Sequence, residues 1–137
     1  MRRFDRWEQP VIEHGVPTRW GWVVLYPERL KLGMYTDIGW GTLIHAGAGV
    51  EIGDYAQIGG GTKIYSVDTI DDIRGPVFIG RNARIGANSV VLPHAYISEN
   101  SIVGALSLVK NVMIPPNEMW GGIPSRKIKD LYPEVKD

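Results

Sequence analysis

The stretch IGRNARIGANSVVLPHAYISENSIVGALSLV, residues 79–109, decides the fold, because an aliphatic residue returns in it at every sixth position. These positions are Ile79, Ile85, Val91, Ile97, Val103 and Val109. An α-helix repeats near 3.6 residues and an amphipathic strand repeats at two, so neither accounts for the spacing. A period of six is typical of a solenoid in which the chain bends after each short extended segment, three segments completing a coil of about 18 residues.

A second inward position lies two residues before each aliphatic one, and a small or β-branched residue fills it. The same rule holds upstream, where the aliphatic positions are Leu32, Ile38, Ile44, Ile52, Ile58 and Ile64. The small positions are Thr36, Thr42, Val50, Ala56, Thr62, Val77, Ala83, Ser89, Ala95, Ser101 and Ser107. One large and one small inward residue per segment predict a narrow, three-sided core and an all-β solenoid.

Two interruptions of the repeat predict loops. Ile44 and Ile52 are eight positions apart, so HAGAGVE, residues 45–51, holds a two-residue insertion. Ile64 and Ile79 are fifteen positions apart, so YSVDTIDDIRGP bulges out, and we expect a loop over residues 65–78. Loops on a rigid scaffold are where binding and catalytic residues concentrate.

Glycine follows the aliphatic position in seven segments, at Gly33, Gly39, Gly53, Gly59, Gly80, Gly86 and Gly104. Because glycine adopts backbone angles that other residues avoid, we expect these glycines to form the tight corners of the coil.

The composition predicts one globular domain over residues 1–137, with an N-terminal cap at 1–25, coils at 26–114 and a closing segment at 115–137. Repeat arrays need capped ends, and Trp7, Trp20 and Trp22 could cover the first of them. The chain has no cysteine and a net charge of zero, which excludes a disulfide framework and gives no sign of a nucleic-acid surface. No apolar run reaches the length of a membrane span, so we expect a soluble cytoplasmic protein.

Three segments carry a resemblance to a known family: GPVFIGRNARIGANSVVLP, IVGALSLVKNVMIPPN and WGGIPSRKIK. Over about Leu32 to Lys129 the chain resembles the hexapeptide-repeat acyltransferases, in particular the galactoside and maltose O-acetyltransferase group and its relatives in polysaccharide biosynthesis. The resemblance implies a left-handed parallel β-helix, a homotrimer, acetyl-CoA as co-substrate, and acceptor sites in the grooves between subunits. It implies no metal.

The resemblance also implies where coenzyme A would lie. The pantetheine arm would follow the coil that bears Gly104, Ala105 and Ser107, where small side chains let backbone amides approach. Lys110, Arg126 and Lys129 would meet the phosphates, because cations with hydrogen-bonding heads favour such groups. Trp120 either packs on the adenine or closes the solenoid. Arg84 stands where relatives often carry an aromatic residue, so substrate contacts there differ.

Acyl transfer to a hydroxyl needs a base near neutral pH, and histidine suits that task. The place where the galactoside and maltose group carries its histidine falls here on Thr69, which cannot act as that base. The repeat register places His45 beneath Tyr65, since stacked strands lie about 4.8 Å apart. It places His94 one coil beyond Val67. Both histidines are therefore expected at the mouth of the loop, one from each side, as candidate acid–base residues.

The acidic loop supplies another candidate. Asp68 could act as a carboxylate base or hold a substrate amine, and Tyr65, Asp68 and Arg84 are candidates for acceptor binding. A solvated turn histidine and a solvated acidic loop remain the structural alternatives for these residues. An amine acceptor that arrives deprotonated would weaken the need for a protein base.

Taken together, the sequence predicts an acyl-CoA-dependent acyltransferase acting on a hydroxyl or amino group of a sugar or sugar nucleotide for surface polysaccharide synthesis. One alternative is a catalytically silent trimeric scaffold or sugar-nucleotide binding module, which the threonine at position 69 favours. The other is a γ-class carbonic anhydrase, which needs three histidine ligands. The three histidines do not have that spacing, because His14 lies outside the repeats.

Overall fold

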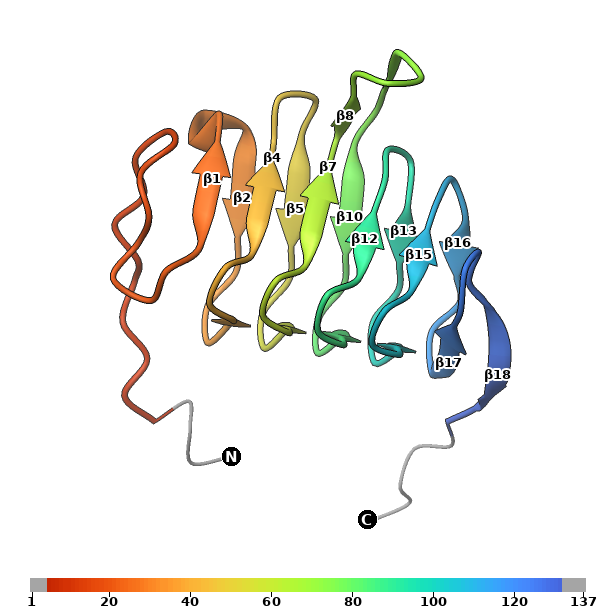
Figure 1. The fold of residues 1–137 in the computed structure, drawn as a ribbon. Helices are drawn as coiled ribbons and strands as arrows, with labels where there is room; N and C mark the ends of the chain where they lie inside the picture. The colour runs from red at the N-terminus through yellow and green to blue at the C-terminus, as the bar shows by residue number, and fades with distance from the viewer. Residues whose placement is uncertain (1–4, 132–137) are drawn as a thin grey trace.

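The structure, a computed structural model, describes residues 5–131, and nearly all of its regular elements are short strands. The chain winds in successive coils that stack side by side, as Figure 1 shows. Each coil contributes one strand to each of three parallel sheets, which form the three walls of a prism. The left-handed parallel β-helix predicted from the sequence is therefore confirmed.

Three sheets, named here I, II and III, make the walls. Sheet I contains β1 (Val23–Leu25), β4 (Leu43–His45), β7 (Lys63–Tyr65), β12 (Val90–Val91) and β15 (Leu108–Val109). Sheet II contains β2 (Leu30–Leu32), β5 (Val50–Ile52), β10 (Val77–Ile79), β13 (Tyr96–Ile97) and β16 (Met113–Ile114). Sheet III contains β3 (Asp37–Ile38), β6 (Gln57–Ile58), β11 (Arg84–Ile85), β14 (Ile102–Val103), β17 (Glu118–Gly121) and β18 (Arg126–Asp130).

The core is the ladder of aliphatic side chains that the six-residue repeat predicted. In sheet III, Ile58 and Ile85 are paired in register, and in sheet I Ile64 is paired with Val91. The aliphatic positions from Ile38 to Val109 are all buried, and most are completely inaccessible. Full burial of such a side chain stabilises the fold by about 1.5–3 kcal/mol. The edge residue Leu32 is only partly buried, because no coil precedes its own in sheet II.

The small inward positions are also buried, and their hydroxyl groups hydrogen-bond to backbone carbonyls at the corners. Thr42 donates to the carbonyl of Gly59 at 3.2 Å, and Ser89 donates to that of Gly86 at 2.9 Å. A buried hydroxyl costs little free energy when it has such a partner. Threonine and serine can therefore occupy a narrow core beside isoleucine and valine.

The glycines that follow the aliphatic positions have a different role from the one expected. None of the seven has a positive φ; the left-handed corner residues are instead non-glycine residues such as Tyr35, Tyr55 and Asn82. A Cβ on Gly59 would lie 2.5 Å from the backbone nitrogen of Ala87 in the next coil, and one on Gly53 would lie 2.7 Å from that of Arg81. The expectation of permissive corner angles was wrong, because six of these glycines are needed where backbones of stacked coils approach closely, Gly104 being the exception.

Segments outside the repeats cover the two ends of the β-helix, and a short 3-10 turn lies in its first coil. Between β1 and β2, the 3-10 turn η2 (Pro27–Arg29) connects sheets I and II. The segment before β1 covers the first coil, where Gly15 N–H donates to the carbonyl of Val24 at 2.8 Å. At the other end β18 folds back antiparallel on β17. No helix within residues 5–131 is long and apolar enough to cross a membrane.

The expected loop is an antiparallel hairpin of β8 (Val67–Asp68) and β9 (Ile73–Arg74). It leaves the corner between sheets I and II and projects beyond the other corners, as Figure 1 shows. The hairpin is closed at its base, where Gly75 N–H donates to the carbonyl of Ser66 at 2.9 Å. The stacking of β7 and β10 on their neighbours therefore continues on either side of the hairpin.

Candidate functional site

The base of the β8–β9 hairpin, which we call the loop mouth, contains two of the three histidines. His45 and Tyr65 are paired in register in sheet I, as the sequence predicted. The His45 ring lies against Gly47, where an added Cβ would be 2.8 Å from the ring and 3.3 Å from the Val67 side chain. The His45 ring and the start of the hairpin therefore both border Gly47.

The hydrogen bond to the His45 side chain determines which of its two ring nitrogens carries the proton. Its Nδ1 accepts the backbone N–H of Gly47 at 3.2 Å, so the proton of the neutral ring lies on Nε2. Burial lowers the pKa of His45, and the nearby charges of Arg74 and His14 lower it further, while its own backbone carbonyl acts in the opposite direction. Neutral His45 is therefore a hydrogen-bond donor through Nε2.

His14 also lies close to this corner, which the repeat did not indicate. Its Nδ1 accepts the backbone N–H of Tyr26 at 2.9 Å, and its ring meets the Tyr26 ring edge-on with centroids 4.9 Å apart. The Tyr26 ring lies 5.4 Å from that of His45. His14 belongs to the cap, outside the periodic segment, so spacing along the sequence gave no signal for this contact.

His94 reaches the loop mouth from the following coil. It is an exposed corner residue with φ 69°, and its backbone N–H donates to the carbonyl of Pro76 at 3.1 Å. Its ring occupies the space that a side chain on Gly75 would need. Within residues 5–131 neither ring nitrogen of His94 has a hydrogen-bond partner, so both are available to a substrate.

The acidic residues of the hairpin have structural contacts. Asp68 Oδ1 accepts the backbone N–H groups of Ile70 at 3.0 Å and of Asp71 at 3.4 Å, which shapes the turn. Asp71 lies 3.9 Å from the ammonium group of Lys110, with both side chains about half exposed. Thr69 is exposed on the hairpin. Lys110 therefore lies beside the turn of the hairpin rather than with the other cations assigned to coenzyme A.

A groove of about 420 Å³ runs along the outer face of sheet III. Its lining includes Gly59, Gly86 and Gly104 in three successive coils, together with Ala105 and Arg84. A Cβ on Gly104 would meet no atom closer than 3.8 Å, so this stretch of the groove is open. The structure thus brings together two residues assigned to coenzyme A and one assigned to the acceptor.

Ser107 and Trp120 support the end of this groove from inside. The buried Ser107 hydroxyl donates to the carbonyl of Gly104 at 2.6 Å and accepts the backbone N–H of Gly122 at 3.1 Å. Trp120 packs against the core, and its indole N–H donates to Glu118 at 2.9 Å. Both residues are engaged in closing the last coil.

The remaining cations lie on β18, at the end of sheet III. Arg126 and Lys129 are both exposed, and within the described part of the chain the Arg126 guanidinium donates only to the neighbouring carbonyl of Ser125 at 3.1 Å. Lys127 between them is already paired with Asp130 at 2.8 Å and Glu118 at 3.3 Å. Hydrogen bonds to these carboxylates, first Asp130 and then Glu118, raise the pKa of Lys127.

The candidate residues therefore form two half-sites on different walls of the prism. The loop mouth lies at the corner between sheets I and II, whereas the groove and β18 belong to sheet III, the opposite wall. Among residues 5–131 no three His, Cys, Asp or Glu side chains gather in a way that could hold a metal ion.

Comparison with known proteins agrees with this geometry. The family model for the bacterial transferase hexapeptide (six repeats) matches residues 76–111. The matched segment covers the last stretch of uninterrupted repeats, about a quarter of the chain. Galactoside O-acetyltransferase of Escherichia coli (strain K12) is 41% identical over 56 residues, which are 41% of this chain and 27% of that protein. The chain therefore spans about a quarter of the length of this curated relative.

Two solved structures have the same architecture. A hexapeptide-repeat acetyltransferase of Vibrio cholerae, solved with acetyl coenzyme A, superposes with a TM-score of 0.73 and 25% identity, covering 81% of this chain and 65% of that one. A mutant of AntD, an N-acyltransferase of Bacillus cereus solved with dTDP and coenzyme A, superposes with a TM-score of 0.71 and 27% identity, covering 83% and 67%. The resemblance to hexapeptide-repeat acyltransferases drawn from the sequence is confirmed.

Proposed function

We propose that this protein is an acetyl-CoA-dependent acyltransferase that modifies a hydroxyl or amino group of a sugar or sugar nucleotide. The observation that carries the proposal is the pair of half-sites: an open glycine-lined groove on sheet III and a loop mouth with two histidines. The relatives support the donor, since the similar Vibrio structure contains acetyl coenzyme A. A role in surface polysaccharide synthesis is part of the proposal and rests on the resemblance.

The two histidines would have different tasks at the loop mouth. As the acceptor atom bonds to the acyl carbon and the bond from that carbon to sulfur breaks, the acceptor gives up a proton and the leaving coenzyme A thiolate takes up a proton to become the thiol. His94, whose ring nitrogens have no hydrogen-bond partner among residues 5–131, would take the acceptor's proton. His45 presents an N–H and would hydrogen-bond to the acceptor or to the acyl oxygen.

The acceptor atom is either oxygen or nitrogen, and each has a relative to support it. The similar Escherichia coli protein is named as an O-acetyltransferase, whereas AntD is named as an N-acyltransferase. The threonine at position 69 favours nitrogen, because a free amine needs less help from a base than a hydroxyl does.

Two copies of the chain are needed to complete the site under this proposal. The groove and the loop mouth of one chain lie on opposite sides of the prism, so one chain does not present both to the same side. A closed ring of identical subunits could place the groove of one copy against the loop mouth of the next. The homotrimer implied by the resemblance is such a ring.

The proposal is tested by measuring thiol release from acetyl-CoA in the presence of sugar nucleotides that carry free hydroxyl or amino groups. The chain has no cysteine, so a thiol reagent reports only the released coenzyme. We expect acceptor-dependent release and an acetylated product by mass spectrometry. A chain that binds acetyl-CoA or sugar nucleotides but releases no thiol with any acceptor would instead be a binding module.

The tail residue Arg126 gives an independent test of the donor site. Arg126→Ala should weaken acetyl-CoA binding by about 1–3 kcal/mol, the range for a hydrogen bond to a charged group. Lys31→Ala, which removes an exposed cation from the outer face of sheet II, is the matched control and should bind normally. Unchanged affinity in Arg126→Ala, measured by calorimetry, would contradict the assignment of β18 to the phosphates.

A further inference from the structure

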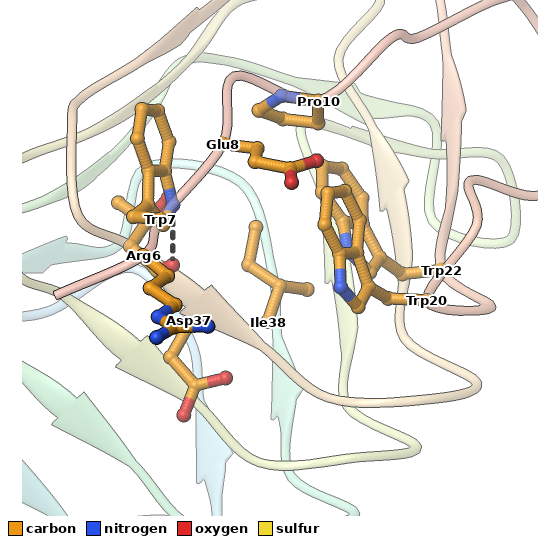
Figure 2. Close-up of a pocket in the computed structure, with 9 residues that line it drawn as sticks. Arg6, Trp7, Glu8, Pro10, Trp20, Trp22, Asp37 and Ile38 are labelled. Atoms are coloured by element: carbon orange, nitrogen blue, oxygen red, sulfur yellow. Dashed lines mark hydrogen bonds between the residues drawn. The ribbon is translucent and has the colours of Figure 1, made fainter. Parts of the chain in front are cut away.

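A second pocket lies between the N-terminal segment and the first strand of sheet III. We call it the cap pocket, and its volume is about 270 Å³. Figure 2 shows Trp7 on one side, Trp20 and Trp22 on the other, and Ile38 between them. It is built by residues 6–22 and β3, on the wall of the prism opposite the loop mouth.

Contacts within the protein hold both aromatic walls in place. The indole N–H of Trp7 donates to the carbonyl of Thr36 at 2.9 Å, and the Trp7 ring lies 5.7 Å from that of Tyr35. On the other side a tight turn is fixed by Thr18 N–H donating to the Trp22 carbonyl at 2.8 Å and Gly21 N–H donating to the Thr18 carbonyl at 2.9 Å. The pocket is therefore preformed, which lowers the entropic cost of binding a ligand.

Part of this aromatic surface faces solvent. Trp22 and Ile38 are buried and form the inner surface, whereas the Trp20 side chain is 39% exposed and Trp7 is partly exposed. Indole faces carry partial negative charge and attract the weakly positive C–H groups of a ligand. A ligand that lay between Trp7 and Trp20 would remove apolar surface on both sides from water.

Polar groups surround the aromatic rings. Glu8 binds Arg19 at 2.7 Å, and the Arg19 guanidinium lies 5.0 Å from the centre of the Trp20 ring. Asp37 and Arg6 also line the pocket, so together with the Glu8–Arg19 pair two carboxylates and two guanidinium groups surround the rings. Because these charges balance, the pocket has no excess charge to attract an ionic ligand, and its polar groups offer hydrogen bonds to hydroxyl groups.

We propose that the cap pocket binds a single neutral pyranose unit. A sugar ring has an apolar face of C–H groups and an edge of hydroxyls, which match the indoles and the surrounding charged groups. The volume falls just under the range of about 300–1,000 Å³ found for drug-sized ligands, which suits a single ring. This site is separate from acyl transfer, and the inference does not depend on the proposed function.

The five tryptophans provide the test, because each contributes one indole N–H signal to a ¹H–¹⁵N spectrum. The full chain, without acetyl-CoA, is titrated with methyl α-D-glucopyranoside, methyl β-D-galactopyranoside and adenosine. We expect at least one pyranoside to shift the Trp7 and Trp20 signals with a Kd on the order of 1 mM, leaving Trp120 unchanged. Adenosine should not shift them.

Three substitutions test whether the pyranoside binds in the cap pocket. Trp20→Ala should weaken pyranoside binding at least tenfold, while Trp40→Phe, an exposed tryptophan that does not line the pocket, should leave the affinity unchanged. Because Trp20→Ala could loosen the turn, Glu8→Gln tests the pocket with all rings present and should weaken binding severalfold. The inference is overturned if neither pyranoside shifts Trp7 and Trp20, if both Trp20→Ala and Glu8→Gln bind normally, or if adenosine binds there more tightly. Pyranoside binding in the cap pocket can be observed even if the protein has no transferase activity, so the two proposals can fail separately.

Discussion

His45 and His94 lie at the same loop mouth, yet their ring nitrogens have different surroundings. His45 accepts a backbone N–H through Nδ1, whereas His94 has no hydrogen-bond partner on either nitrogen among residues 5–131. A base needs a free lone pair directed at the substrate, and a donor needs a fixed N–H. The contacts therefore favour His94 as the base and His45 as the donor.

Substitution of each histidine should separate these roles. We expect His94→Ala to lower kcat at least about 100-fold, because general base catalysis contributes that much or more. His45→Gln keeps an N–H donor and should retain activity within about tenfold, whereas His45→Ala should lose more. Steady-state kinetics with acetyl-CoA at saturation measures all three. Normal turnover by His94→Ala would remove this histidine from the mechanism.

The lowered pKa of His45 also predicts how stability depends on pH. A histidine with a folded pKa below its unfolded value of about 6.5 binds protons more readily in the unfolded chain. Its contribution to stability is therefore complete above about pH 6.5 and is lost as the pH falls below that value. Urea unfolding of the wild type should lose stability on acidification, and His45→Gln should lose less. Equal slopes in the two proteins would contradict the prediction.

For individual residues, the sequence predicted a position only where the six-residue repeat determined which residues of neighbouring coils are stacked. The register paired His45 with Tyr65 and directed His94 to the base of the hairpin, and the structure has both there. It could not reveal His14, whose contact with Tyr26 depends on the path of the non-repeating cap. It also could not show that Asp68 shapes its own turn, since that depends on the local conformation of the hairpin.

Among the structural elements, the glycine corners determine how closely successive coils can stack. Gly59 and Gly104 follow equivalent inward residues in sheet III, but only Gly59 has another backbone within 3 Å of where its Cβ would be. The last coil has more room at this corner than the coils before it. The sequence shows glycine at both places and gives no indication of this difference.

This contrast provides a matched pair of substitutions. Gly59→Ala would force the coil backbones apart and should destabilise the protein by about 2 kcal/mol or more. Gly104→Ala, with its nearest neighbour at 3.8 Å, should change stability by less than about 0.5 kcal/mol. Urea titration of both variants provides the measurement. A similar loss in the two would mean that close approach is not the reason for glycine at these positions.

For the whole molecule, the fold was predictable because one short rule is obeyed along most of the chain. A six-residue period admits few architectures, and the buried ladder from Ile38 to Val109 follows the predicted positions. The ends do not obey that rule. The pocket formed by Trp7, Trp20 and Trp22 results from non-periodic contacts and could not be anticipated from spacing.

The separation of the two half-sites predicts that inactive subunits can complement one another. Ala105→Trp would fill the groove and His94→Ala would disable the loop mouth, so each variant alone should be inactive. In a random equal mixture of closed rings, about a quarter of the shared sites would combine an intact groove with an intact loop mouth. Activity should therefore reappear after the two variants are unfolded and refolded together. Continued inactivity of the mixture would argue for a site within one chain.

The hydrogen bond between Gly75 and Ser66 has a consequence for how such proteins diversify. Because it joins the two ends of the hairpin, residues between them can be added, removed or exchanged as a cassette while the neighbouring strands keep their partners. Lengthening a closed loop costs little conformational entropy, roughly 0.6 kcal/mol for each doubling. Under the proposed function, changes confined to the hairpin would therefore be enough to alter acceptor preference, and a foreign hairpin could be grafted at the same two residues.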